Sequence, residues 1–264
     1  MKLVLSLVLL GFVLPGLTFA AVDPALSNLT KSQVEDVAKE IAVDLNHTSV
    51  AAPSTNGFFG VEVGLVGSRT KTPHLADRID DAGGTGSDFN QIYGGGLIVR
   101  GHFPLDLFVE LSMLPTYKTS SLEVKSSGFS AGWNMGGFFN WPIDLAFGAD
   151  FSRSKLNFDQ TIASVDSNIG VRNSSRTLWV GVSKTFLIVT PYAKFGAFST
   201  DSDVKQDGTS TTFTYTTSST SSVSSTGAYG ALGVNVQILL FRLGIEGSRT
   251  AGVSKGSAKF SFAF

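Results

Sequence analysis

The stretch that decides the fold runs from Phe129 to Phe151 and reads FSAGWNMGGFFNWPIDLAFGADF. Successive side chains of a β-strand point to opposite faces, so residues two apart share a face. From Phe129 to Trp141 the odd-numbered residues are mostly large and apolar, and the even-numbered ones are mostly Gly, Ser and Asn. The alternation resumes from Leu145 to Phe151. The stretch therefore predicts a hairpin whose two strands are joined by a tight turn at Pro142-Ile143-Asp144.

The two faces of this hairpin indicate its surroundings. One face is oily and aromatic, whereas the other is too small and too polar to pack a dry core. A soluble β-sandwich shows the reverse arrangement, with bulky residues inside and polar residues outside. A transmembrane barrel points apolar side chains at lipid and polar side chains at its lumen. The hairpin is therefore typical of a membrane-spanning β-barrel.

The chain of 264 residues begins with a predicted secretory signal peptide, residues 1–20. Lys2 precedes an apolar run from Leu3 to Leu17, and small residues end the segment near Ala20. Pro15-Gly16 interrupts the run, which is shorter than the roughly 20 residues that a membrane-spanning helix needs. The chain has no cysteine for disulfides or thiolate metal sites, and its net charge of -1 gives no basis for nucleic-acid binding.

Residues 21–56 differ from the rest of the chain and are predicted to form a periplasmic N-terminal segment. Apolar residues recur at helical spacing between Ser32 and Leu45, with charged residues between them, which predicts a short helix. The run from Ala51 to Asn56 is typical of a linker. We favour a solvated helix in the periplasm; the alternative is a helix that plugs the lumen of the barrel.

Alternation of apolar and polar residues continues from residue 57 to residue 264, which we interpret as one transmembrane, antiparallel, up-and-down β-barrel. Four short links separate the strands on one rim, and long polar links dominate the other, as in bacterial outer-membrane barrels. Counting the links predicts an all-β fold of about ten strands, with eight or twelve as alternatives. The long links are 68–90, 115–127, 155–175 and 200–227. Ser and Thr fill the last of them, which favours an extension of the flanking strands and leaves an adhesive surface open.

Two motifs carry a resemblance to a known family. Residues 191–197 (PYAKFGA) resemble a Pro-Tyr-x-x-x-Gly strand opening, and the chain ends in alternating aromatics closed by Phe264. On these motifs, residues 57–264 resemble the small outer-membrane β-barrel superfamily that includes the transmembrane domain of outer-membrane protein A. The resemblance implies location in the bacterial outer membrane and insertion by the barrel-assembly machinery, with an assembly signal at Phe260, Phe262 and Phe264. It implies no particular activity.

Charged side chains also fall on the inward-facing positions, where their signs are nearly balanced. Because unpaired charges are costly to bury, we interpret these residues as a network of lumen ion pairs. Their long side chains are expected to fill the space that inward glycines leave and to close the lumen at rest. The alternative is the charge ring of a selective pore. The predicted lumen network is Glu62, Arg100, His102, Glu110, Asp150, Lys194, Arg242 and Glu246.

The sequence shows no catalytic constellation. No histidine lies beside Asp201 or Asp203 at the long-loop rim, and His74 falls in a polar link without an orienting partner. We therefore expect no catalytic, cofactor or metal site, and a structural or surface-interaction role through the long loops. A narrow, porin-like passive channel is the alternative, and an outer-membrane protease or lipid-modifying enzyme comes third. The expected partners are outer-membrane lipid, lipopolysaccharide and an unidentified surface ligand, with the chain acting as a monomer and binding no nucleic acid.

Overall fold

The computed structural model describes residues 31–53, 60–81, 90–118, 122–139, 141–162, 165–210 and 215–264. The predicted signal peptide and the predicted linker beyond Pro53 lie outside these residues. Among the described residues, no helix combines the length and the hydropathy needed to cross a bilayer.

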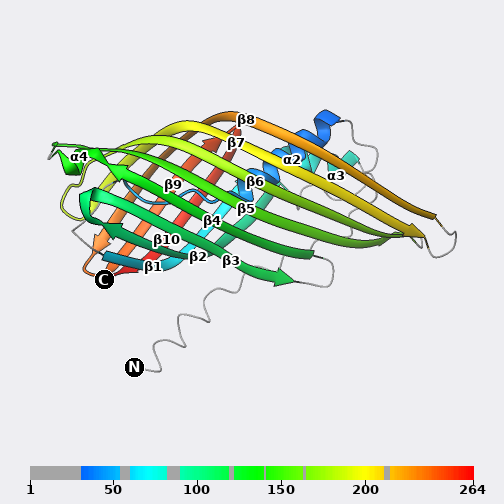
Figure 1. The fold of residues 1–264 in the computed structure, drawn as a ribbon, viewed down its shortest axis with the longest axis horizontal. Coiled ribbons are helices and arrows are strands. Elements are labelled where there is room, and N and C mark those ends of the chain that lie inside the picture. Colours follow the sequence, from blue (N-terminus) through cyan, green and yellow to red (C-terminus); the bar gives the residue numbers. More distant parts are fainter. Residues whose placement is uncertain are drawn as a thin grey trace, which may run out of the picture.

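Ten antiparallel strands form a closed barrel, as the alternation predicted (Figure 1). Every strand pairs with its neighbours in the sequence, and β1 closes the barrel by pairing with β10. The predicted N-terminal helix is also present as α2, Lys31–Leu45. The strands are β1 Gly60–Lys71, β2 Gln91–Phe103, β3 Leu107–Lys118, β4 Leu122–Asn134, β5 Asp144–Ile162, β6 Val165–Ser183, β7 Val189–Ser210, β8 Tyr215–Ile238, β9 Phe241–Thr250 and β10 Val253–Ala263.

An apolar belt surrounds the outside of the barrel. Its members are large hydrophobic side chains that stay exposed, such as Leu178 at 61%, Phe195 at 64% and Ile245 at 70%. Neighbouring residues on the same strands are buried in the lumen, for example Lys194 and Glu246. The two faces therefore have the inverted polarity that the hairpin sequence indicated.

The fourth strand ends earlier than predicted. β4 stops at Asn134 instead of Trp141, and a helical turn, α4 (Met135–Phe138), follows it. A Cβ on Gly136 would lie 2.6 Å from the backbone nitrogen of Leu145, so glycine lets this turn pack against the start of β5. The apolar residues of this turn happen to keep a spacing of two, which the sequence reading mistook for strand.

Strands β5 to β8 are much longer than the other strands and project beyond them at one end of the barrel (Figure 1). They contain 19, 19, 22 and 24 residues, about twice the 9–11 that a tilted spanning strand needs. The predicted extension of the strands into the Ser/Thr-rich fourth link is confirmed. The prediction of a long link at residues 155–175 is wrong. Most of these residues belong to β5 and β6 and pair with one another. Its polar and charged residues resembled a loop, although polar cross-strand pairs can stabilise a solvated sheet.

Candidate functional site

The N-terminal segment fills the lumen. Residues 42–53, which we call the plug, are buried except for the half-buried Leu45. The segment is therefore not solvated as predicted, and its arrangement is the lumen plug that was the alternative. Helical spacing shows that one face of a segment is apolar, but it does not show what that face packs against.

Helix α2 lies at the long-loop rim, where it holds the link between β1 and β2. The Glu40 carboxylate accepts hydrogen bonds from the backbone N–H groups of His74 (3.0 Å) and Leu75 (2.9 Å). These groups belong to the first turn of α3 (Pro73–Asp81), whose N–H groups lack partners inside the helix. His74 thus lies in a capped helix and not in an irregular loop. Burial raises the pKa of Glu40 above its ordinary value, and the two amide bonds oppose this shift.

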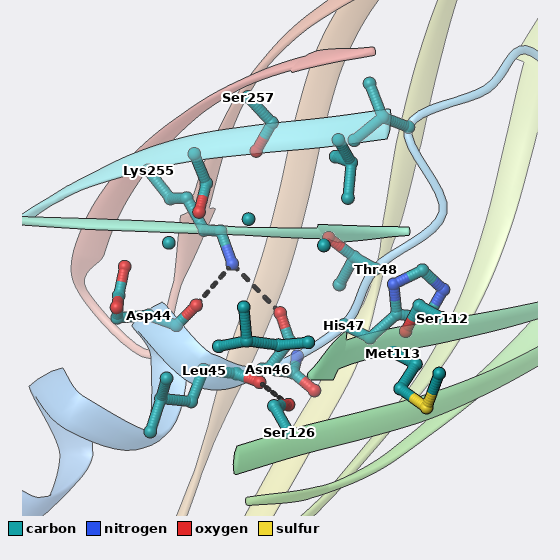
Figure 2. A pocket seen from close by; sticks show the side chains of 17 residues that line it. Asp44, Leu45, Asn46, His47, Thr48, Ser112, Met113, Ser126, Lys255 and Ser257 are labelled. Carbon is teal, nitrogen blue, oxygen red and sulfur yellow. Dashed lines mark hydrogen bonds between the residues drawn. The ribbon is translucent and has the colours of Figure 1, made fainter. Parts of the chain in front are cut away.

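Lys255 of β10 anchors the upper part of the plug. Its ammonium group donates hydrogen bonds to the carbonyls of Val43 (3.2 Å), Asp44 (2.8 Å) and Asn46 (2.9 Å). The Ser126 hydroxyl of β4 donates to the carbonyl of Leu45 at 3.1 Å. Figure 2 shows the contacts to Asp44, Leu45 and Asn46, which border a cavity of about 50 Å³. The barrel wall therefore binds the plug through backbone groups at the point where α2 ends.

The middle of the plug is bound through its side chains. The Asn46 amide oxygen accepts a hydrogen bond from the Ser152 hydroxyl (2.7 Å), and its nitrogen donates to the Thr177 hydroxyl (3.4 Å). The imidazole of His47 lies 3.1 Å from the carboxylate of Glu110. These partners come from β3, β5 and β6, so the plug contacts several walls of the barrel at one level.

Ser49 joins the plug to two buried ion pairs. Its hydroxyl donates to Glu110 (3.0 Å) and accepts from Arg100 (3.1 Å), and its carbonyl accepts from the Lys194 ammonium group. Arg100 lies 3.5 Å from Glu110, and Lys194 lies 3.1 Å from Glu246. Because both pairs are fully buried, these extra hydrogen bonds help to offset the cost of removing the charges from water.

The remaining predicted lumen charges gather nearer the short-turn rim. Glu62 accepts from Arg242 at 2.9 Å and from Lys259 at 2.7 Å, and His102 lies 3.9 Å from the same carboxylate. Asp150 is buried on the inward face, but no ion pair joins it to another described residue. The predicted lumen charges thus gather in two clusters, one bound to Ser49 of the plug and one around Glu62.

Sequence reasoning missed several members of the two clusters. Lys259 alternates with the outward residues Phe260 and Phe262, so its inward direction could have been read from the period of two. Tyr192, whose hydroxyl donates to Glu246 at 2.9 Å, also lies on an inward position. His47 and Ser49 gave no such signal, because they precede the first strand.

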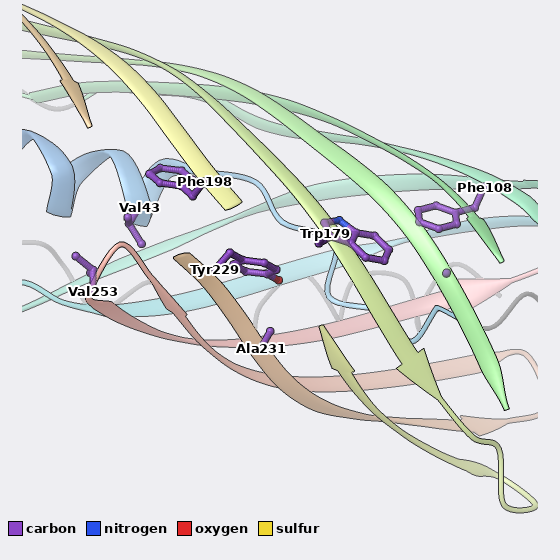
Figure 3. Packing of buried hydrophobic residues seen from close by; sticks show 8 residues of the cluster. Val43, Phe108, Trp179, Phe198, Tyr229, Ala231 and Val253 are labelled. Atoms are coloured by element: carbon purple, nitrogen blue, oxygen red, sulfur yellow. The ribbon is translucent and has the colours of Figure 1, made fainter. Parts of the chain in front are cut away.

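Aromatic side chains occupy much of the remaining lumen (Figure 3). Phe108 and Trp179 stack with ring centroids 6.3 Å apart, and Phe198 and Tyr229 belong to the same buried cluster as Val43 of the plug. A Cβ on Gly148 would collide with the Trp179 ring, so this glycine makes space for the indole. The expectation that charged side chains fill the space left by the glycines is wrong here, since an aromatic ring fills it.

The C-terminal aromatic residues close the barrel seam. The rings of Phe241, Phe260 and Phe262 contact one another, with centroids 5.0 to 6.1 Å apart. The backbone of Phe264 exchanges two hydrogen bonds with Val61 of β1, at 2.8 and 3.0 Å. A role of these residues in recognition by the assembly machinery stays a prediction.

Comparison with known proteins identifies the family. The model of a family of unknown function, DUF6588, matches residues 103–264, from the end of β2 to the end of the chain. The chain belongs to this family. The plug and most of the first two strands precede the matched region. No curated protein matches the DUF6588 chain.

The chain is also similar to solved outer-membrane proteins. The NalP autotransporter translocator domain of Neisseria meningitidis is 10% identical, with 91% of this chain and 96% of that chain covered and a TM-score of 0.44. The attachment invasion locus protein Ail of Yersinia pestis is 12% identical, with coverage of 80% and 100% and a TM-score of 0.34. The outer membrane protease OmpT of Escherichia coli is 10% identical, with coverage of 80% and 98% and a TM-score of 0.39. At TM-scores below 0.5, these likenesses carry no argument about the function of this chain.

Proposed function

We propose that the DUF6588 chain is a non-enzymatic outer-membrane barrel that is closed by its own N-terminal segment and acts at the cell surface. The observation that carries this proposal is the plug, which is buried and hydrogen-bonded to the wall along the lumen. A closed lumen leaves the outer surfaces as the parts that can meet a partner. Of these, strands β5 to β8 project roughly 30 Å beyond the apolar belt, given a rise of about 3.3 Å per residue.

The location rests on the polarity of the wall. A belt of exposed apolar side chains around a polar, ion-paired lumen suits a barrel in a bilayer, and short turns face the periplasm in outer-membrane barrels. The long strands then stand outside the cell, and the plug enters the lumen from that side. An epitope tag inserted before Lys31 should therefore be accessible to antibody on intact cells. Labelling only after the outer membrane is permeabilised would reverse this orientation.

The surface role is tested by shortening the two projecting hairpins. We expect variants that lack residues 156–169 or 206–219 to reach the outer membrane at normal levels and to keep the heat-dependent gel mobility of folded barrels. We expect cells that display the full chain to autoaggregate and cells that carry either variant to lose this autoaggregation. Unchanged autoaggregation with both variants would overturn the surface-interaction role. Increased sensitivity of these cells to detergent, with autoaggregation intact, would instead support a purely structural one.

A gated passive channel is the second candidate, and the chemistry of the plug contacts favours it. Many contacts between plug and wall are polar, and a polar segment can exchange its partners for water at lower cost than an apolar one. Cavities of about 50 and 30 Å³ lie beside the plug near the two rims. Brief, rare openings of the full chain in planar bilayers would support this candidate, whereas complete silence over a wide voltage range would count against it.

A further inference from the structure

Strands β4, β5 and β6 lie next to one another in the barrel wall (Figure 1). Five cations lie on the outer surface of these three strands. All five point away from the lumen, because each is an even number of residues from the exposed Phe129, Phe151 or Leu178 on its own strand. The chain as a whole has 20 Lys and Arg against 21 Asp and Glu, so this concentration is local. We call the group the cationic cluster; it consists of Lys125, Arg153, Lys155, Arg172 and Arg176.

Strand register places these cations next to one another. Lys125 pairs with Lys155, and Lys155 pairs with Arg172, so three cations form one row across three strands. Arg153, two residues below Lys155, pairs with Ser174 and has Arg172 and Arg176 as its diagonal neighbours. Directly opposed residues are about 5 Å apart and diagonal ones about 7–8 Å. Like charges at these spacings repel one another.

Neighbouring acids neutralise the cluster only in part, because among the described residues the outward carboxylates that border its five cations are three, Asp201, Asp203 and Glu123. Asp203 pairs with Arg172 in register, but its carboxylate accepts a hydrogen bond from Ser222 on the far side of β7, at 2.7 Å. Asp201 likewise accepts from Ser224 at 2.7 Å. Among the described residues, no ion pair within 4.0 Å involves any of the five cations. The cluster therefore presents positive charge to whatever lies beside the barrel wall.

The cluster borders the apolar belt. The row below it contains Phe129 and Phe151, whose rings lie 6.5 Å apart, and Phe151 pairs with Arg176. Below that row the outward positions are apolar, with Ala131, Ala149 and Leu178. A ligand that covers both surfaces must be anionic at its upper end and apolar below.

We propose that the cationic cluster binds the phosphorylated headgroup of lipopolysaccharide, with the acyl chains lying on the aromatic and aliphatic surface beneath it. Arginine binds phosphate through paired, charge-assisted hydrogen bonds, and lysine contributes point charge. The five cations span roughly 10 Å across the strands and roughly 13 Å along them, which is room for more than one phosphate. This inference rests on the proposed location, since only the outer leaflet of the outer membrane would bring this lipid to the long-loop rim.

The test uses the purified, folded full-length chain, so its outcome does not depend on where the protein resides in cells. Binding of fluorescent lipopolysaccharide is measured for the unmodified chain and for the double variant Arg153→Gln/Arg172→Gln. The matched control is Lys71→Gln/Lys184→Gln, which removes two exposed cations that lie away from the cluster. We expect the Kd to rise at least tenfold in the first variant and to stay unchanged in the control. Equal Kd values for the unmodified chain and the cluster variant would overturn the proposal.

Two further arms identify the ligand chemistry. Chemically dephosphorylated lipopolysaccharide should bind about as weakly to the unmodified chain as the intact lipid binds to the cluster variant. Millimolar inorganic phosphate should not displace the intact lipid, because it lacks the acyl chains. Full binding of the dephosphorylated lipid, or displacement by inorganic phosphate, would overturn the assignment of a phosphorylated lipid.

Thermal unfolding in neutral detergent controls for misfolding. Removing two repelling cations should leave the Tm of Arg153→Gln/Arg172→Gln unchanged or raise it, whereas added lipopolysaccharide should raise the Tm of the unmodified chain more. A Tm of the cluster variant well below that of the unmodified chain would mean that the cations support the fold, and would overturn the proposal.

Discussion

Replacing Lys255 by Met should loosen the plug. The ammonium group of Lys255 donates three hydrogen bonds to plug carbonyls, at 3.2, 2.8 and 2.9 Å. A hydrogen bond that involves a charged group contributes about 1.5–3 kcal/mol net. The carbonyls can turn to water here, because the adjoining cavity of about 50 Å³ has room for about four water molecules. We therefore take about 1 kcal/mol for each bond, which gives a loss of about 3 kcal/mol.

A loss of about 3 kcal/mol corresponds to a factor of about 100 in an equilibrium constant, since about 1.4 kcal/mol is tenfold. In planar bilayers, the fraction of time that a single barrel of the Lys255→Met variant conducts should rise about 100-fold over the unmodified chain. Lys205→Met is the control, because it removes an exposed cation on the outside of β7. If Lys255→Met and Lys205→Met conduct equally rarely, the backbone contacts of Lys255 do not hold the plug, and the reasoning fails.

Three other perturbations follow from the structure. Val180→Arg should lower the free energy of unfolding in micelles by roughly 2–4 kcal/mol, the usual effect of a cation on the lipid face at mid-depth. An unchanged urea midpoint would mean that β6 is shifted by one residue, so that Val180 faces the lumen. Deleting Phe264 should lower the level of the protein in the outer membrane of cells more than the yield of refolding in detergent. Its backbone closes the seam with β1, and its ring belongs to the predicted assembly signal. Normal levels in cells would refute a role of Phe264 in assembly. The raised pKa of Glu40 means that the folded state favours its protonated form, so stability from this group is complete below its unfolded pKa and is lost as the pH rises through the folded pKa. The free energy of unfolding should therefore increase on acidification from pH 7, and urea titrations should show a smaller increase for Glu40→Gln.

The barrel wall could be predicted from the sequence because it depends on a period of two. Alternation puts Phe195 outside and Lys194 inside whatever the neighbouring strands contain, and hydrocarbon outside the wall makes the two faces chemically distinct. The same rule fails where alternation is accidental, as at α4. It also fails where both faces are polar, as in residues 155–175, because such a strand has no face that differs from a loop in composition.

The sequence could not show that the N-terminal segment plugs the lumen, although this was one of the two alternatives for it, the other being a solvated helix. The spacing of apolar residues in α2 fits a helix against any apolar partner, and that partner includes Phe198 and Tyr229, which come from strands much later in the chain. Ser49 binds the wall mainly through one hydroxyl and one carbonyl, groups that every serine has. Contacts of this kind depend on tertiary structure alone.

The most direct test of the account is the conductance of the full chain compared with a chain that lacks residues 31–52. Both are folded into the same planar bilayers, after circular dichroism and heat-dependent gel mobility have shown that each barrel is intact. We predict that the full chain stays closed at rest and that the shortened chain conducts steadily. Steady conductance of the full chain, or a folded but silent shortened chain, would contradict the claim that the N-terminal segment closes the barrel.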